Sequence, residues 1–138
     1  MIFPDIRDIN IVNVYERGVP NKERSLFKTD TLLNLGEYGV MIGLLQKNGL
    51  ALPYHDNLYP FKDVNLPPNS WIFLYTGPGT DYNGKMPHDN SPFHVFHWGK
   101  PTTVFAHSLI IPVLFRIGAV QLGSFPINLP QFEGAVIE

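Results

Sequence analysis

Apolar residues in this chain come in short runs separated by glycine and proline, a pattern typical of brief β-strands joined by turns. The 138 residues include 12 Gly and 13 Pro. After Leu35, the longest stretch without either residue is Thr102–Ile111, which is short for a helix, and both residues penalise helix interiors. The window Asn21–Leu35 is longer, but its apolar positions form no helical stripe, so we predict strand and loop there.

β-Branched and aromatic residues between turn signals predict a series of short strands. They are Ile9–Tyr15, Glu23–Lys28, Gly39–Gln46, Phe61–Val64, Trp71–Thr76, Phe93–Trp98, Thr103–Ala106, Val113–Ile117 and Ala119–Leu122. Trp71–Tyr75 is apolar at every position, which predicts a central strand covered on both faces, with Trp71 in the core. This spacing of strands indicates one all-β domain over residues 1–138, a sandwich or a barrel.

Five segments follow one another in an order that a known family shares. They are Gly18–Arg24 after the strand Ile9–Tyr15, then Asn34–Val40, Leu66–Ile72, Tyr75–Gly79 and Phe96–Gly99. Over about residues 9–100 this order resembles the lamin-tail-like domain family. The resemblance implies an immunoglobulin-like antiparallel β-sandwich of about 8–9 short strands that acts as a non-catalytic interaction module, and it supplies no catalytic residues.

Charge and composition exclude several classes of partner. The formal net charge is −2, which offers no basic footprint for nucleic acid. The longest apolar run, Leu109–Phe115, is far shorter than the ~20 residues of a membrane span. Residues 1–8 contain no apolar signal-peptide core, which favours the cytoplasm. The chain has no Cys, so we expect no disulfide scaffold and no cysteine nucleophile.

The segment Gly77–Pro92 is predicted to be irregular, and loops of this length are often functional. Its candidates for contact with a ligand are Asp81, Tyr82, Lys85, His88 and Asp89. Tyr54 and Tyr59 also lie among polar turn residues, so we predict that they and Tyr82 contact a sugar or a peptide. A plain surface connection is the alternative interpretation of the loop.

Two catalytic motifs are incomplete. Gly79–Lys85 satisfies the first part of a phosphate-binding loop, but Met86 stands where Ser or Thr would hold magnesium. Pro87 and Pro92 exclude the helix that would cradle the phosphate. Ser108 lies next to a histidine but in no G-x-S-x-G elbow. We therefore expect no nucleotide or other cofactor, and a non-enzymatic role is favoured.

Histidines are concentrated in one part of the chain. His88, His94, His97 and His107 lie within twenty residues, and such density suggests a metal site. On an extended strand His94 and His97 point to opposite faces, so a site would need His55-Asp56 or His88-Asp89 from loops. No metal is predicted, and these four histidines are the candidate ligands if one is bound.

Charge nearly disappears toward the C-terminus. Residues 1–47 hold six basic and six acidic residues, whereas residues 101–138 hold only Arg116, Glu133 and Glu138. Apolar patches that face water usually mark an interface, although these residues would alternatively fill the inner face of a second sheet. We predict that residues 123–138 form an apolar contact segment, with Phe125 and Phe132 as candidate contacts. Pro126 and Pro130 exclude a central strand in this segment.

The sequence thus favours a non-enzymatic β-sandwich that binds a protein partner or self-assembles as a homo-oligomer. Two alternatives stay open. One is a small metal-assisted hydrolase that uses the histidine cluster. The other is a sandwich that binds a carbohydrate or a peptide, which requires Tyr54, Tyr59 and Tyr82 to line one open groove.

Overall fold

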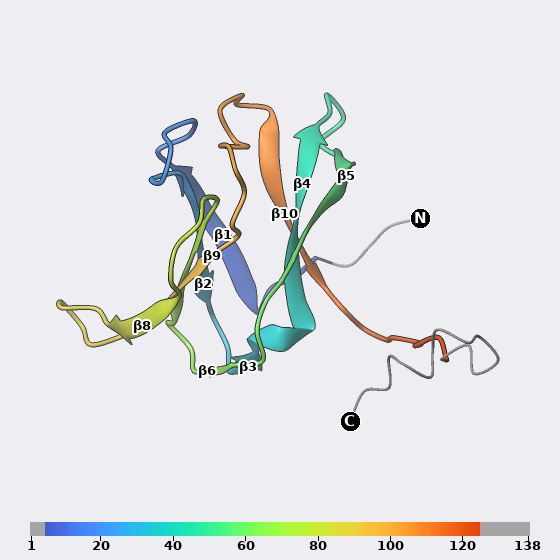
Figure 1. The fold of residues 1–138 in the computed structure, drawn as a ribbon. Coiled ribbons are helices and arrows are strands. Elements are labelled where there is room, and N and C mark those ends of the chain that lie inside the picture. Colours follow the sequence, from blue (N-terminus) through green and yellow to red (C-terminus); the bar gives the residue numbers. More distant parts are fainter. Residues whose placement is uncertain (1–4, 125–138) are drawn as a thin grey trace, which may run out of the picture.

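The computed structural model describes residues 5–124, apart from the side chains of residues 52–56, and the chain forms two facing β-sheets (Figure 1). The strands are β1 (Ile9–Tyr15), β2 (Arg24–Thr29), β3 (Leu33–Asn34), β4 (Tyr38–Leu45), β5 (Ala51–Pro60), β6 (Asn65–Leu66), β7 (Trp71–Tyr75), β8 (Tyr82–Lys85), β9 (Pro92–His97) and β10 (Ile110–Arg116). One sheet has the order β1-β2-β7-β9-β8 and the other the order β10-β4-β5, while β3 and β6 pair separately. The predicted all-β sandwich of short strands is confirmed.

The core lies between the two sheets. Its main cluster includes Val40 from β4, Ile72 and Leu74 from β7, and Phe27 and Phe96 from β2 and β9. A smaller cluster contains Val14, Ile42 and Phe105. Each of these large side chains contributes about 1.5–3 kcal/mol when it is fully buried, so the contact between sheets is the main source of stability.

β7 and β9 are parallel neighbours, unlike the antiparallel pairs predicted for the sandwich. The chain leaves β7, forms the edge strand β8 and returns through β9, which lies between β7 and β8. Because β8 lies inside Gly77–Pro92, the prediction that this whole segment is irregular is wrong. Tyr82–Lys85 has one large apolar side chain, so its pattern is too weak to predict a strand that pairing with β9 creates.

Three other predicted strands are wrong. Residues 61–64, 103–106 and 119–122 are irregular, because strand propensity forms no strand without a partner ladder. Phe61 is nevertheless 5% exposed and belongs to the core. The pattern also fails to predict the longest strand, β5, since Pro53 and a run of polar residues interrupt its apolar positions.

The prediction that Trp71–Tyr75 is covered on both faces is also wrong. Ile72 and Leu74 are buried, whereas Trp71, Phe73 and Tyr75 point to the other face and are half-buried. Trp71 is therefore outside the core, where Lys28 Nζ lies 4.6 Å from its ring centre. Neighbouring strands flank β7 on both sides, and the side chains on its outward face are half-buried.

The helical structure of the described residues is one 3₁₀ turn, η1 (Leu35–Glu37), between β3 and β4. The Asn34 side chain caps it by accepting a hydrogen bond from the backbone N of Gly36 at 2.8 Å. No helix within residues 5–124 has the length and apolar character needed to cross a bilayer.

Candidate functional site

An open hollow of about 740 Å³ lies where β5 ends and β8 begins. It brings together two residues singled out by the sequence, Tyr59 and Asp81, with Lys62 and His97. Tyr59 belongs to β5, Asp81 comes directly before β8, and His97 is the last residue of β9. Segments far apart in the sequence therefore meet here because the two sheets face each other.

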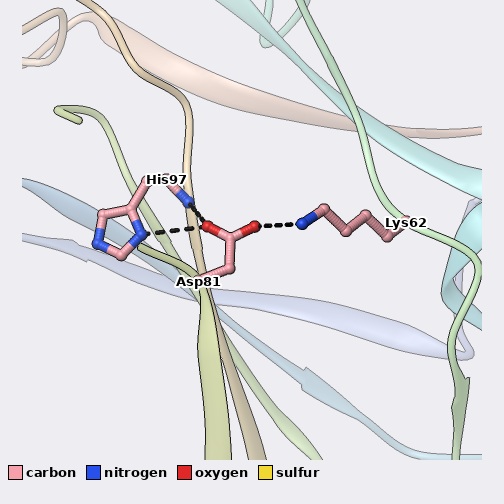
Figure 2. A network of polar contacts seen from close by, with 3 residues as sticks. All are labelled: Lys62, Asp81 and His97. Atoms are coloured by element: carbon pink, nitrogen blue, oxygen red, sulfur yellow. Dashed lines mark hydrogen bonds and ion pairs between the residues drawn. The ribbon is translucent and has the colours of Figure 1, made fainter. Parts of the chain in front are cut away.

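Asp81 is the centre of the polar network in this hollow, as Figure 2 shows. Its Oδ2 accepts a hydrogen bond from Lys62 Nζ at 2.7 Å, and its Oδ1 accepts one from the backbone N of His97 at 2.9 Å. His97 Nδ1 lies 3.2 Å from the same Oδ1. Burial raises the pKa of Asp81, but hydrogen bonds from Lys62 and His97 outweigh it and hold the pKa below its ordinary value. The carboxylate is thus charged, and it orients the His97 ring through Nδ1.

Within residues 5–124, the side chain that hydrogen-bonds to the His97 ring is that of Asp81. The ring stacks on Tyr75 with ring centres 5.4 Å apart, and its other edge packs so closely on Gly79 that a Cβ there would overlap it. Within residues 5–124 no serine or threonine hydroxyl hydrogen-bonds to the ring. The Asp81–His97 pair therefore fixes the loop before β8 to β9.

Tyr59 faces the core as well as the hollow. Its ring packs edge-on against Phe61 with centres 5.5 Å apart, and it also contacts Phe96 and Trp98. Burial, together with the negative charge of Asp81, raises the pKa of Tyr59 to about 12. The phenol consequently stays protonated where Tyr59 lines the hollow.

Of the three tyrosines predicted as contacts, the two whose side chains the structure describes, Tyr59 and Tyr82, do not line one groove. Tyr82 is 56% exposed and packs against Phe93 on β9, and it does not line the hollow beside Tyr59. The side chain of Tyr54 lies outside the described part of the chain. The two tyrosines that are described therefore serve different surfaces.

The remaining predicted loop residues, Lys85, His88 and Asp89, are exposed at the turn between β8 and β9. Asp89 Oδ1 accepts hydrogen bonds from the backbone N and the hydroxyl of Ser91, at 3.0 and 2.6 Å. The Ser91 hydroxyl is the main reason that the pKa of Asp89 lies below its ordinary value. Asp89 thus stabilises the turn, and of the predicted loop residues only Asp81 reaches the hollow.

The four histidines do not converge. His94 stacks on Phe96 with ring centres 6.1 Å apart, and burial lowers its pKa. His97 lies on the opposite face of β9, as predicted, while His107 accepts a hydrogen bond from the backbone N of Leu109 before β10. Among the described residues no three His, Asp or Glu side chains are placed to hold a metal ion.

Glu23 is a structural residue that the sequence pattern does not reveal. Its carboxylate is buried and accepts hydrogen bonds from the backbone N of Gly18, Val104 and Phe105, at 2.7, 2.8 and 3.0 Å. These bonds fix the turn after β1 to residues 103–106 and satisfy backbone groups that a strand would otherwise pair. Glu23 also lines a cavity of about 310 Å³, but its oxygens are already engaged by the backbone. The only sequence signal for this role of Glu23 is its charge at an inward position of the predicted strand Glu23–Lys28.

The outward face of the five-stranded sheet carries cations that lie on aromatic rings. We call Arg24, Lys28, Trp71, Phe73, Tyr75 and Phe93 the aromatic face. Strand register aligns Arg24 with Tyr75, and Lys28 with Trp71, across β2 and β7. Arg24 Cζ lies 5.5 and 5.7 Å from the ring centres of Tyr15 and Tyr75. This arrangement joins two positive charges to a half-buried aromatic surface.

The outward face of the three-stranded sheet is apolar. We call the following residues the apolar face: Gly39, Met41, Gly43, Leu58, Pro60, Ile111, Val113 and Phe115. Their neighbours Val40, Ile42 and Leu114 point inward to the core clusters. Gly39 allows the Phe115 ring to lie on β4, because a Cβ at this position would overlap it.

The chain after β10 continues away from the sandwich (Figure 1). Ile117, Val120 and Leu122 are 39%, 69% and 85% exposed, so residues 117–124 do not cover the apolar face. The predicted contact residues Phe125 and Phe132 follow them and lie outside the described residues.

Comparison of the chain with family models, with curated proteins and with solved structures gives no match. Its class is therefore defined by the fold, an all-β sandwich of short strands in which each main sheet has a largely apolar or aromatic outward face.

Proposed function

We propose that this chain is a non-enzymatic, lamin-tail-like β-sandwich module that self-assembles through the apolar face. The observation that carries the proposal is that the outward positions of β4 and β10, with Leu58 and Pro60 of β5, bear no polar side chain. An antiparallel sheet that faces water normally alternates apolar and polar residues. A contiguous exposed apolar patch is typical of an interface, and a second copy of the chain offers a surface of the same character.

Pairing through this face is favoured over pairing through the edge strands β1 and β10. The edge strand β1 has a register shift between Ile11 and Asn13, and such a bulge weakens pairing with another strand. The edge strand β10 contains Pro112, which has no N–H to donate. These two of the four sheet edges thus resist extension of the sheets, whereas Leu58 on the apolar face is 53% exposed.

The size of the apolar face suggests a role for the C-terminal segment. Three strands and seven residues of length give roughly 300 Å² of flat sheet, while a stable interface buries about 800 Å² on each partner. Residues 123–138 are rich in apolar side chains and follow β10 after a connection of six residues, 117–122. We propose that this segment of one copy adds to the contact on the other copy.

Sedimentation velocity of two matched variants tests the surface. Leu58 on the apolar face is 53% exposed and Leu32, away from it, is 73% exposed, so glutamate is tolerated by the fold at both. We expect the wild type and Leu32→Glu to form oligomers and Leu58→Glu to sediment as a monomer. Oligomers of Leu58→Glu as stable as those of the wild type would contradict the proposal.

Truncation after Leu122 tests the segment. We expect the shortened chain to keep its circular dichroism spectrum and its cooperative unfolding but to lose most of its self-association. A wild-type monomer whose truncated form aggregates would mean that the segment covers its own sheet, and it would overturn self-assembly. Global unfolding on truncation would instead assign the segment to the core and would contradict the proposed contact.

A further inference from the structure

We propose a second site, on the aromatic face: it binds an acidic peptide segment in extended conformation. This surface lies on the other sheet, so the proposal does not depend on self-assembly. Its observations are two cations held on aromatic rings, outward rows of β2, β7 and β9 that contain no acidic residue, and a footprint suited to a short peptide.

The rings hold both cations in place before any ligand arrives. Arg24 lies between Tyr15 and Tyr75, and its Nη1 also donates to the Lys22 carbonyl at 2.9 Å. Lys28 lies over Trp71. A long side chain that is already ordered loses less entropy when it binds, so each cation is prepared to pair with an anion.

The charge of this face calls for an anionic partner. The outward positions of β2, β7 and β9 are Arg24, Leu26 and Lys28, then Trp71, Phe73 and Tyr75, then Phe93, Val95 and His97. None of these nine residues is acidic. Asp30 directly follows Thr29 at the end of β2, and its Oδ2 accepts a hydrogen bond from Asn10 Nδ2 at 2.6 Å, so this carboxylate is engaged by the cross-strand neighbour of Lys28. Arg24 and Lys28 are four residues apart on β2, which is about 13 Å along the strand. Carboxylates four residues apart in an extended peptide are separated by the same distance.

The same contacts favour a peptide over a sugar or a globular domain. A sugar stacks on an open ring, but Lys28 covers the ring of Trp71, and Arg24 and His97 cover that of Tyr75. The outward rows of these three strands measure roughly 13 by 14 Å, much less than the ~800 Å² that a stable protein–protein interface buries on each partner. Trp, Tyr and Arg are the residues that dominate binding energy in small hot spots.

Fluorescence anisotropy with defined probes tests the site. The probe is a labelled nine-residue peptide with Glu at every second position, and its matched control has Gln at those positions. Measurements use protein at concentrations below its self-association. We expect the Glu peptide to bind at least tenfold more tightly than the Gln peptide. We also expect 0.5 M salt to lower the affinity for the Glu peptide by a similar factor.

Two variants locate the binding. Lys28→Gln is expected to lower the affinity for the Glu peptide at least fivefold. Lys47 is an exposed lysine in the β4–β5 turn, and Lys47→Gln is expected to leave this affinity unchanged. Equal affinity for the two peptides, or equal loss in both variants, would overturn the proposal. Polygalacturonate that binds as tightly as the Glu peptide would also overturn it, because the face would then recognise anionic chains in general.

Discussion

At the scale of single residues, the buried carboxylate of Glu23 takes the place of a partner strand as the acceptor for backbone N–H groups. Its oxygens accept hydrogen bonds from the backbone N–H groups of Gly18, Val104 and Phe105. Arg17 supports the same segment, since its Nη1 donates to the carbonyls of Phe105 and Ile110. One acid and one base therefore hold the long connection between β9 and β10 without a β-ladder.

Replacing Glu23 by Gln is expected to destabilise the fold by about 2–4 kcal/mol. Gln keeps the shape of the side chain, but it turns an acceptor of three backbone N–H groups into a group that is half donor, and a buried N–H without a partner costs about 1–3 kcal/mol. Urea denaturation followed by tryptophan fluorescence measures the loss. Glu37→Gln, at an exposed residue, is the control, and equal stability of the two variants would contradict this role of Glu23.

His94 makes stability depend on pH. Burial lowers its pKa below the ordinary 6.5, so the unfolded chain binds the proton more tightly than the folded chain does. The stability from this residue is therefore complete above pH 6.5 and is lost as the pH falls through the folded pKa. Asp81, whose pKa is also lowered, has its effect only near and below pH 3.8.

We expect His94→Phe to unfold with a shallower pH dependence than the wild type between pH 7.5 and 5. Phe keeps a ring that can stack on Phe96 but carries no proton. The free energy of unfolding at both pH values, from urea titrations, gives the comparison. The exposed His88→Gln serves as control and should keep the wild-type slope; a His94→Phe variant with that same slope would refute the assignment.

At the scale of elements, the sequence pattern predicts those strands whose own residues form a clear apolar run. β1, β2, β4, β7, β9 and β10 each correspond to a predicted run within a few residues. β8 and β5 escape prediction because Tyr82–Lys85 is mostly polar and Ala51–Pro60 contains Pro53 and charged neighbours. Partner strands decide both cases, and pairing partners are not encoded in the local pattern.

The candidate surfaces were less predictable than the strands. An all-apolar run such as Trp71–Tyr75 has no alternation, so it cannot show that aliphatic residues point inward and aromatic residues outward. Asp81 is recognisable as a polar loop residue, but its contacts with Lys62 and His97 depend on how the sheets face each other. The apolar face follows from register, which joins Met41 to Val113 and Leu58 across three strands.

Gly39→Ala tests the packing of the apolar face. A Cβ at this position would overlap the Phe115 ring and lie 3.0 Å from the Tyr59 carbonyl oxygen, so the ring must move. We expect a loss of about 1–3 kcal/mol in the free energy of unfolding, the usual cost of overpacking. Gly118→Ala meets no atom within 4 Å and is the control.

The double variant Gly39→Ala/Phe115→Leu separates overlap from other effects of the methyl group. If the ring is the obstacle, the smaller Leu recovers part of the stability that Gly39→Ala loses, and the two changes are not additive. Purely additive losses would place the strain elsewhere, against the Tyr59 backbone.

At the scale of the whole molecule, the sandwich keeps its two outward surfaces apart. The aromatic face belongs to the sheet that contains β2, β7 and β9, and the apolar face to the sheet of β10, β4 and β5. The core lies between them. A module of this kind can assemble on one side and remain open to a ligand on the other.

The two surfaces are therefore expected to act independently. Leu58→Glu, which removes self-association, should bind the Glu peptide with an affinity within twofold of the wild type, because no residue of the aromatic face changes. Lys28→Gln should bind the peptide weakly and still form wild-type oligomers. Sedimentation velocity and anisotropy on the same preparations measure both properties. If Leu58→Glu also lost the peptide, assembly would be needed to complete the binding site, and the peptide would then have to contact two copies of the chain.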